Sequence, residues 1–380
     1  MAGRQRLSAW LLVLGTVVMT LAGAGSAAAS YPGRAGAITF QENSDSIDYL
    51  NNGASSDQYS FDFVRPPGRD VARRVFCRDG SGDFSGSGEQ YCPLVPYTGS
   101  SYPSDGPSWS PDGKRLVFAG ALYHNDGSRT PTLRDCPGEC EAIVLANADG
   151  RSPRLLPVAI GDAEEPAFMP DGKTLIFAGK TTAGAPYDLY TAATDGTALQ
   201  RLTGNGASHP APCASGSIVY VHQRDLYLRD AGGRTRRLTR HGGSLPDCSR
   251  DSRTIAFVRD GALYTIHASG RGLRRLSPRR VVASRPAFSP AGGLIAVTTI
   301  TDSPGCASAS TSAHTDYRLE LIDLRGRRHR SYAIHREDCV RPNPEALSDV
   351  AWQPLPTPSK LTGRGGNVLP RREAPPVPHT

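Results

Sequence analysis

After its first 29 residues the sequence has no run of about 20 apolar residues, which excludes a membrane-spanning helix in the remainder. It also has no G-x-S-x-G motif and no residues left over to build an α/β-hydrolase domain, so a nucleophile elbow of that kind is excluded. Only four of the 43 basic residues are lysines. The arginines lack the interleaved aromatic residues of a surface that stacks bases, so they are interpreted as solvated and no nucleic-acid partner is expected.

The apolar run near the N-terminus has the features of an export signal. Arg4 and Arg6 precede the run from Leu11 to Leu21, and small residues follow it up to Ala29. We predict that residues 1–29 are a signal peptide and that the protein is secreted or held in the cell envelope, with no stable membrane span once the signal is cleaved. Retention of the signal as an anchor is the alternative. Cleavage removes two arginines and lowers the formal net charge from +7 to +5, which is modest for this length.

Eight cysteines are an even number in an exported chain, where disulfide bonds are the default. Proximity in the sequence makes three pairs plausible, namely Cys77 with Cys92, Cys136 with Cys140, and Cys306 with Cys339. Cys213 and Cys248 could bridge neighbouring repeats or pack as small apolar groups. Zinc is the rival interpretation of the pair at 136 and 140, but no second pair lies nearby and no metal site is predicted there.

Degenerate copies of the stretch PSWSPDGKRLVF recur along the chain, and a close copy in pattern is PAFMPDGKTLIF. The copies lie near residues 107, 166, 211, 246, 286 and 350. One repeat position is taken by Trp109, Phe168, Cys213, Cys248, Phe288 and Trp352, which lie 35–64 residues apart. About 40 residues is the length of a propeller blade. The shared position predicts that the aromatic residues pack between blades and do not form a carbohydrate-binding set.

Each repeat predicts four strands. A short apolar strand ends in a Pro-Asp-Gly-like turn, and an alternating strand follows, which is a strong hairpin signal. Third strands are predicted at 141–146, 187–192, 225–229, 262–267 and 317–323. A glycine turn follows each of them, at Gly150, Gly196, Gly232, Gly270 and Gly326, and the fourth strand ends in a pattern such as Arg-Leu-Thr. Four strands in each unit are typical of a propeller blade.

Five complete blades leave the two ends of the chain unpaired, and the ends fit each other. Trp352 begins a blade with no room to finish, while residues 37–41, 58–64 and 69–76 look like second, third and fourth strands. We therefore predict an all-β, six-bladed β-propeller of four-stranded blades, closed by strands from both termini, over residues 30–356. Closure removes open sheet edges. Residues 357–380 are predicted to be a disordered Pro/Arg-rich tail.

The repeat PSWSPDGKRLVF, with a Tyr-containing third strand and an Arg-Leu-Thr fourth strand, resembles the WD40-like (PD40) repeats of TolB-type six-bladed propellers over nearly all of the mature chain. The resemblance implies a periplasmic platform that binds other envelope proteins and has no catalysis of its own. A separate N-terminal α/β domain is not evident, because strand material begins at Ala37, so the specific partners of TolB do not carry over. Propeller-fold pectate-type lyases are related, but they hold a metal with several histidines around the channel.

A propeller usually binds ligands at the mouth of its central channel, where the loops that enter the innermost strands converge. Here these are the two residues before the first proline of each repeat, or before Val350 in the last copy. Their charged and imidazole side chains belong to Asp105, Glu164, Glu165, His209, Arg285 and Asp349. Such a ring could hold a cation, a basic peptide or a polar ligand through charge-assisted bonds. The simpler interpretation is that these residues are polar because they are exposed to solvent.

The function predicted from the sequence is therefore that of an exported, monomeric, non-catalytic propeller that binds a protein or peptide partner. No cofactor is predicted, although a cation could sit in the channel. The alternative is a metal-dependent propeller enzyme, a lyase or hydrolase that acts on a polysaccharide or small ester, with His209 and nearby carboxylates as ligands.

Overall fold

The computed structural model describes residues 31–48, 54–64, 71–78, 101–103, 107–122, 142–148, 152, 154–182, 184–277, 282–283, 285–302, 314–338 and 347–357. The predicted signal peptide lies outside the described residues, as does the predicted tail apart from Thr357. Among the described residues, no helix is long and apolar enough to cross a membrane.

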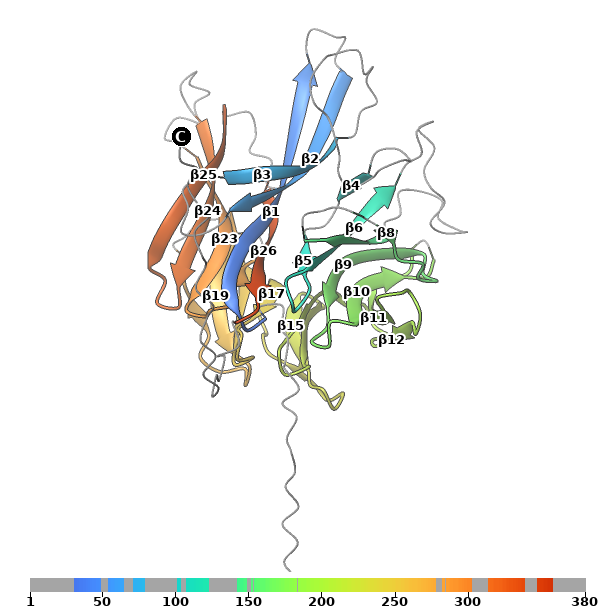
Figure 1. The fold of residues 1–380 in the computed structure, drawn as a ribbon. Helices are drawn as coiled ribbons and strands as arrows, with labels where there is room; N and C mark the ends of the chain where they lie inside the picture. Colours follow the sequence, from blue (N-terminus) through green and yellow to red (C-terminus); the bar gives the residue numbers. More distant parts are fainter. Residues whose placement is uncertain are drawn as a thin grey trace, which may run out of the picture.

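The described strands form six antiparallel sheets, which we number as blades I to VI (Figure 1). Blade I contains β26 (Leu347–Leu355), β1 (Arg34–Asp48), β2 (Ala54–Val64) and β3 (Val71–Arg78); blade II contains β4 (Ser101–Pro103), β5 (Ser108–Trp109), β6 (Arg115–Leu122), β7 (Ala142–Asn147) and β8 (Arg154–Leu155); blade III contains β9 (Asp162–Phe168), β10 (Thr174–Lys180), β11 (Asp188–Ala193) and β12 (Gln200–Arg201). Blade IV contains β13 (Ser208–Pro212), β14 (Ile218–His222), β15 (Asp225–Arg229) and β16 (Thr235–Arg237); blade V contains β17 (Ser244–Cys248), β18 (Thr254–Arg259), β19 (Ala262–His267) and β20 (Arg274–Arg275); blade VI contains β21 (Val282–Ala283), β22 (Ala287–Phe288), β23 (Leu294–Asp302), β24 (His314–Asp323) and β25 (Arg328–Asp338).

The innermost strands contact one another in the order β26, β5, β9, β13, β17 and β22, and β22 contacts β26 again. This closed ring is the propeller predicted from the repeats. Strands β15 and β19 have the predicted bounds. In the turn between the third and fourth strands of blade IV, the glycine with positive φ is Gly233 (φ 86°), one residue after the predicted Gly232.

The turns between the first two strands of a blade are built by their aspartates. In blade II, Asp112 accepts hydrogen bonds from the Ser110 hydroxyl at 2.7 Å and from the Lys114 backbone N–H at 3.1 Å. In blade III, Asp171 accepts the backbone N–H of Lys173 at 2.8 Å. These bonds satisfy turn donors that would otherwise lack a partner in the ladder. The prediction that the Asp-Gly pairs make turns is confirmed.

Blade I is closed by both ends of the chain, as predicted. Strand β1 pairs with β2 on one side and with β26 on the other, and Ile38 stands opposite Trp352. The turn between β5 and β6 of blade II contacts β26, because the Gln353 side-chain amide donates a hydrogen bond to the Gly113 carbonyl at 2.8 Å. Gly113 has φ +67°, and a Cβ atom there would lie 2.0 Å from the Pro354 carbonyl oxygen. Only glycine fits this close approach.

The aromatic residues of the repeats pack between blades. Trp109, Phe168, Phe288 and Trp352 are at most 3% exposed. Phe168 of blade III clusters with apolar residues of blade II, and Phe288 of blade VI clusters with apolar residues of blade V. Burial of one such aromatic side chain contributes about 1.5–3 kcal/mol. The predicted packing role of this position is confirmed.

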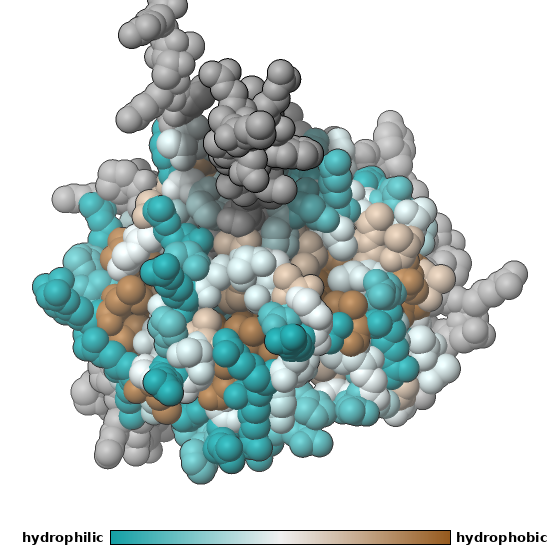
Figure 2. All heavy atoms as spheres, turned by 90° about the horizontal axis from the view of Figure 1, so that it is seen from below, coloured by the Kyte–Doolittle hydropathy of each residue, from teal (hydrophilic) through white to brown (hydrophobic). Residues whose placement is uncertain are grey.

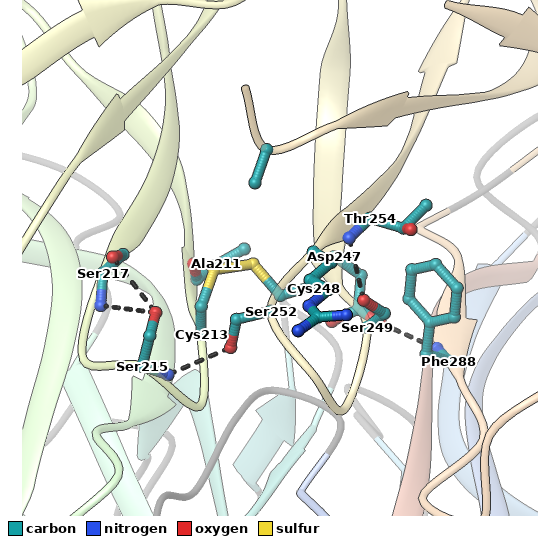
Figure 3. Close-up of a disulfide and its surroundings, with 12 residues drawn as sticks. Ala211, Cys213, Ser215, Ser217, Asp247, Cys248, Ser249, Ser252, Thr254 and Phe288 are labelled. Carbon is teal, nitrogen blue, oxygen red and sulfur yellow. Dashed lines mark hydrogen bonds between the residues drawn. A yellow bond between two sulfur atoms is a disulfide. The ribbon is translucent and has the colours of Figure 1, made fainter. Parts of the chain in front are cut away.

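Cys213 and Cys248 form a disulfide bond that joins blades IV and V (Figure 3). Their Cα atoms are 5.3 Å apart, and both side chains are buried. This selects bridging over the packing of two free thiols, and it fits an oxidising compartment. The Cys77 side chain lies outside the described part of the structure, as do five further cysteines, so these pairings stay predictions: Cys92, Cys136, Cys140, Cys306 and Cys339.

Tyr31 closes the end of the propeller axis at which the Pro-Asp-Gly turns lie, which we call the lower face. The Tyr31 hydroxyl donates to the Phe168 carbonyl in blade III, and the Tyr31 side chain is 1% exposed. The Gly33 N–H donates to the Pro290 carbonyl in blade VI at 3.2 Å. Blades III and VI are opposite in a ring of six, so the segment crosses the axis. The chain that precedes Tyr31 therefore leaves the described structure at the lower face.

Candidate functional site

The innermost strands run from one end of the axis, which we call the channel mouth, towards the lower face. The β1–β2 hairpin projects at the mouth end, because Glu42 of β1 pairs with Leu347 at the start of β26 (Figure 1). The sequence predicted that the mouth residues lie in loops before the innermost strands. This prediction is wrong for four residues that lie within strands: Glu164 and Glu165 in β9, His209 in β13 and Asp349 in β26.

The backbone at these positions explains the difference. Glu165, His209 and Leu245 have positive φ angles of 54°, 51° and 50°, and each directly precedes a proline. The pairing of β9, β13 and β17 shifts register at these positions and then resumes. Positive φ is costly for bulky residues, and the residue before proline is restricted further. Such bulges re-aim side chains and often lie at functional sites.

Three of the predicted residues meet at the mouth although they come from three blades. The His209 Nε2 atom lies 3.1 Å from the Glu165 Oε1 atom, and the His209 backbone N–H donates to the other carboxylate oxygen. The Arg285 Nη2 atom lies 3.7 Å from the same Oε1 atom. Arg285 belongs to blade VI, opposite blade III, so its side chain reaches across the axis. Glu165 is 11% exposed and Arg285 18%, so the pair is only partly screened by water.

Glu164 faces a different set of partners inside blade III. The Tyr187 hydroxyl contacts both the Glu164 carboxylate and the Asp162 Oδ2 atom, the latter at 2.7 Å. Lys180 pairs with Asp162 at 2.8 Å. Burial, aided by the Asp162 and Glu165 carboxylates, raises the pKa of Glu164, although the bond from Tyr187 opposes this. Burial and the two carboxylate partners raise the pKa of Tyr187 well above its usual range.

The two remaining predicted residues have no described side chain at the mouth. Asp105 lies outside the described residues, and Asp349 lies within β26, with a side chain outside the described part. Asp162, Lys180 and Tyr187 were missed by the sequence reasoning because no repeat copy shares them. Among the described residues, no three or more His, Cys, Asp or Glu side chains gather as a metal site would require.

A second arrangement that sequence reasoning missed holds the loops that lead into the mouth. The Asp188 carboxylate accepts hydrogen bonds from Arg201, from the Thr203 hydroxyl at 2.8 Å and from the Gly206 N–H at 3.2 Å. Gly206 lies three residues before His209. The same set recurs in blade IV with Asp225, Arg237, Thr239 and Gly242. Blade V has Ala262 in place of the aspartate. The repeated Arg-Leu-Thr pattern at the end of the fourth strand was the signal in the sequence for this set of hydrogen bonds.

Burial alone would raise the pKa of Asp188 and Asp225, but their hydrogen bonds outweigh it and lower both pKa values. The carboxylates therefore stabilise the fold above the unfolded aspartate pKa of about 3.9. This stabilisation is lost as pH falls through the lower, folded-state pKa.

We expect Asp188→Ala or Asp225→Ala to lower the free energy of unfolding by about 2–3 kcal/mol at pH 7, because charged hydrogen bonds are lost. Urea denaturation at pH 7 and pH 3 checks this, and the loss should shrink at pH 3. Asp260→Asn, at an exposed turn of blade V where the carboxylate makes no hydrogen bond or ion pair with other described residues, is the control. An equal loss at both pH values would contradict the assignment.

The comparisons with known proteins agree on the fold. No protein-family model matches the sequence, and no curated protein matches it. The structure is similar to TolB from Acinetobacter baumannii, with a TM-score of 0.53 and 16% identity, over 84% of this chain and 67% of that chain. It is similar to hydrazine synthase from Kuenenia stuttgartiensis (TM-score 0.53, 12% identity, 86% of this chain and 47% of that chain).

A third similar structure is a chain of a nidogen/laminin complex, with a TM-score of 0.50 and 11% identity, over 83% of this chain and 98% of that chain. At such identities the likeness concerns the fold. This chain has a TolB-like β-propeller fold, as its repeats predicted.

Proposed function

We propose that this protein is an exported, monomeric, non-catalytic propeller that binds a protein or peptide partner at its channel mouth, in the cell envelope or outside the cell. The observation that carries the proposal is that His209 and Arg285 both contact the Glu165 carboxylate. These residues occupy the repeat position where the copies stop agreeing, whereas a position needed only for folding would be expected to stay similar from blade to blade.

The chemistry of the group suits a charged peptide segment. A guanidinium and an imidazole flank a carboxylate near the axis, so an incoming carboxylate could take the place of Glu165 on Arg285. An incoming basic group could instead pair with Glu165. The positive φ at Glu165 and His209 supports a binding role, because such backbone persists where the surroundings hold it in place.

The similar structures give limited support. The nidogen/laminin chain is part of a complex between two proteins, and hydrazine synthase is an enzyme by its name, so the fold does not choose between binding and catalysis. The choice of binding rests on the absence of a nucleophile elbow from the sequence and on the charged trio at the mouth.

A photocrosslinking residue in place of Ser208, beside His209, tests the proposal in the native envelope. We expect a discrete protein adduct, and we expect Glu165→Ala, His209→Ala and Arg285→Ala together to lower its yield at least about tenfold, because a charged hot spot is removed. Glu165→Gln, which keeps the side-chain size, should lower the yield in the same direction.

Lys173→Ala at the lower face is the control, and thermal unfolding verifies that each variant is folded. An unchanged adduct yield in the triple variant would contradict the assignment of the binding site to the channel mouth. A stoichiometric metal ion in the purified protein that His209→Ala removes would instead favour the metal-dependent enzyme.

A further inference from the structure

The turns between the third and fourth strands of blades IV, V and VI concentrate arginine on the lower face. At the residue that closes this turn, blade III has Thr197, whereas the next three blades have Arg234, Arg271 and Arg327. The positions are equivalent, because each backbone carbonyl accepts the N–H of the first turn residue at 2.8 or 2.9 Å. Since threonine closes the same turn in blade III, the turn itself does not require arginine.

Contacts between blades hold these turns side by side. Arg236 donates to the Ala268 carbonyl and so links blade IV to blade V. Arg274 donates to the Arg325 carbonyl at 3.2 Å and links blade V to blade VI. Gly326, at φ +82°, packs so closely that a Cβ atom would lie 2.6 Å from the Leu276 carbonyl oxygen. The three turns therefore form one continuous edge.

Two leucines lie exposed on the same edge. Leu273 is 48% exposed and Leu324 is 40% exposed, and among the described residues these two are the large hydrophobic side chains that stay exposed. Leu273 stands between Arg271 and Arg274, and Leu324 directly precedes Arg325. Figure 2 views the molecule from below, where long hydrophilic side chains project between hydrophobic residues.

We propose that this edge docks on the surface of an anionic phospholipid bilayer. The lower rim, as we call it, consists of Arg234, Arg271, Leu273, Leu324, Arg325 and Arg327. Arginines near an anionic leaflet bind its phosphates, and apolar side chains beside them enter the boundary between headgroups and acyl chains. A soluble polyanion would use the arginines but offers nothing to the leucines.

A further observation favours a membrane. The chain that precedes Tyr31 also leaves the structure at this face, so an export signal that is still attached would place the lower face against the membrane. The lower rim is at the opposite end of the axis from Glu165, so docking would leave the channel mouth pointing away from the bilayer.

Arg271 and Arg325 are the residues to test, because their side chains make no hydrogen bond or ion pair with other described residues, whereas Arg327 pairs with Asp323 at 2.7 Å. The exported chain is sedimented with vesicles of 30% phosphatidylglycerol in phosphatidylcholine and with pure phosphatidylcholine vesicles. Arg271→Gln with Arg325→Gln should weaken binding to the anionic vesicles about thirtyfold. Leu273→Ser with Leu324→Ser should weaken it roughly tenfold.

The matched control is Lys114→Gln with Lys173→Gln, which removes the same charge from exposed turns of the same face in blades II and III. It should change vesicle binding less than about threefold. Equal losses in the arginine and lysine pairs, or no preference for phosphatidylglycerol, would overturn the proposal. Long-chain polyphosphate serves as a soluble probe. Polyphosphate binding as tight as vesicle binding, with neither affected by the leucine substitutions, would assign the rim to a soluble polyanion and overturn the membrane assignment.

Discussion

A chain truncated after Ala346 is expected to lose cooperative unfolding altogether, because it loses β26, the innermost strand of blade I. Val350 and Trp352 are buried in the cluster that joins blades I and VI. Replacing a buried tryptophan by alanine alone costs about 3–5 kcal/mol. Loss of the whole strand also leaves β1 with an open edge and breaks the ring, against a total stability of roughly 5–15 kcal/mol for a typical domain.

Urea denaturation followed by tryptophan fluorescence and circular dichroism checks this prediction. A chain truncated after Thr357 is the matched control, since it keeps β26 and removes only the predicted tail, and it should unfold like the full chain. Trp352→Ala should fall between the two. If the chain that ends at Ala346 unfolded cooperatively at the same urea concentration as the control, closure by both termini would not stabilise the ring.

The repeats were enough to predict the blades because they combine a period-2 pattern with turn residues at both ends. Strand β19 shows this well, since Asp260 and Gly261 precede it and a glycine turn at Gly270 follows it. Strand β1 was predicted at 37–41 but extends from Arg34 to Asp48. Its second half is polar and carries no alternating pattern, so nothing in the sequence marked its pairing with β2.

The mouth could be located from the sequence, but its contacts could not. The position before the first proline is where the copies diverge, and that position did bring Glu165, His209 and Arg285 together. No local spacing rule relates Glu165 to Arg285, which meet because blades III and VI are opposite. The left-handed backbone at Glu165 was also hidden, because proline usually favours an extended residue before it.

The arginines show a similar limit. The sequence suggested a solvated face, and many of these side chains are exposed, but Arg154, Arg236 and Arg274 each donate to a carbonyl of the next blade. A charged residue at a strand end can thus be exposed and structural together. Only the comparison of equivalent positions between blades separates these structural arginines from those such as Arg271, whose side chain makes no hydrogen bond or ion pair with other described residues.

The second large effect is expected from the disulfide bond. Cys213→Ala with Cys248→Ala should lower the free energy of unfolding by about 3–4 kcal/mol, because the bond closes a loop with a sequence separation of 35 residues in the unfolded chain. Both cysteine side chains are buried between the innermost strands of blades IV and V. Alanine keeps this position apolar, so the double variant should still form the propeller.

Guanidinium denaturation of the oxidised protein, the reduced protein and the double variant measures the effect. The folded protein should resist mild reductant, since neither sulfur atom is accessible, while the protein unfolded and then reduced should refold to the lower stability of the double variant. The link joins blade IV to blade V at the lower-face end of their innermost strands, away from the mouth. His209 lies near the mouth end of β13 and Cys213 directly follows the other end, so the double variant should weaken crosslinking at Ser208 less than the loss of Glu165 does. A double variant as stable as the wild type would show that packing alone holds these two blades together.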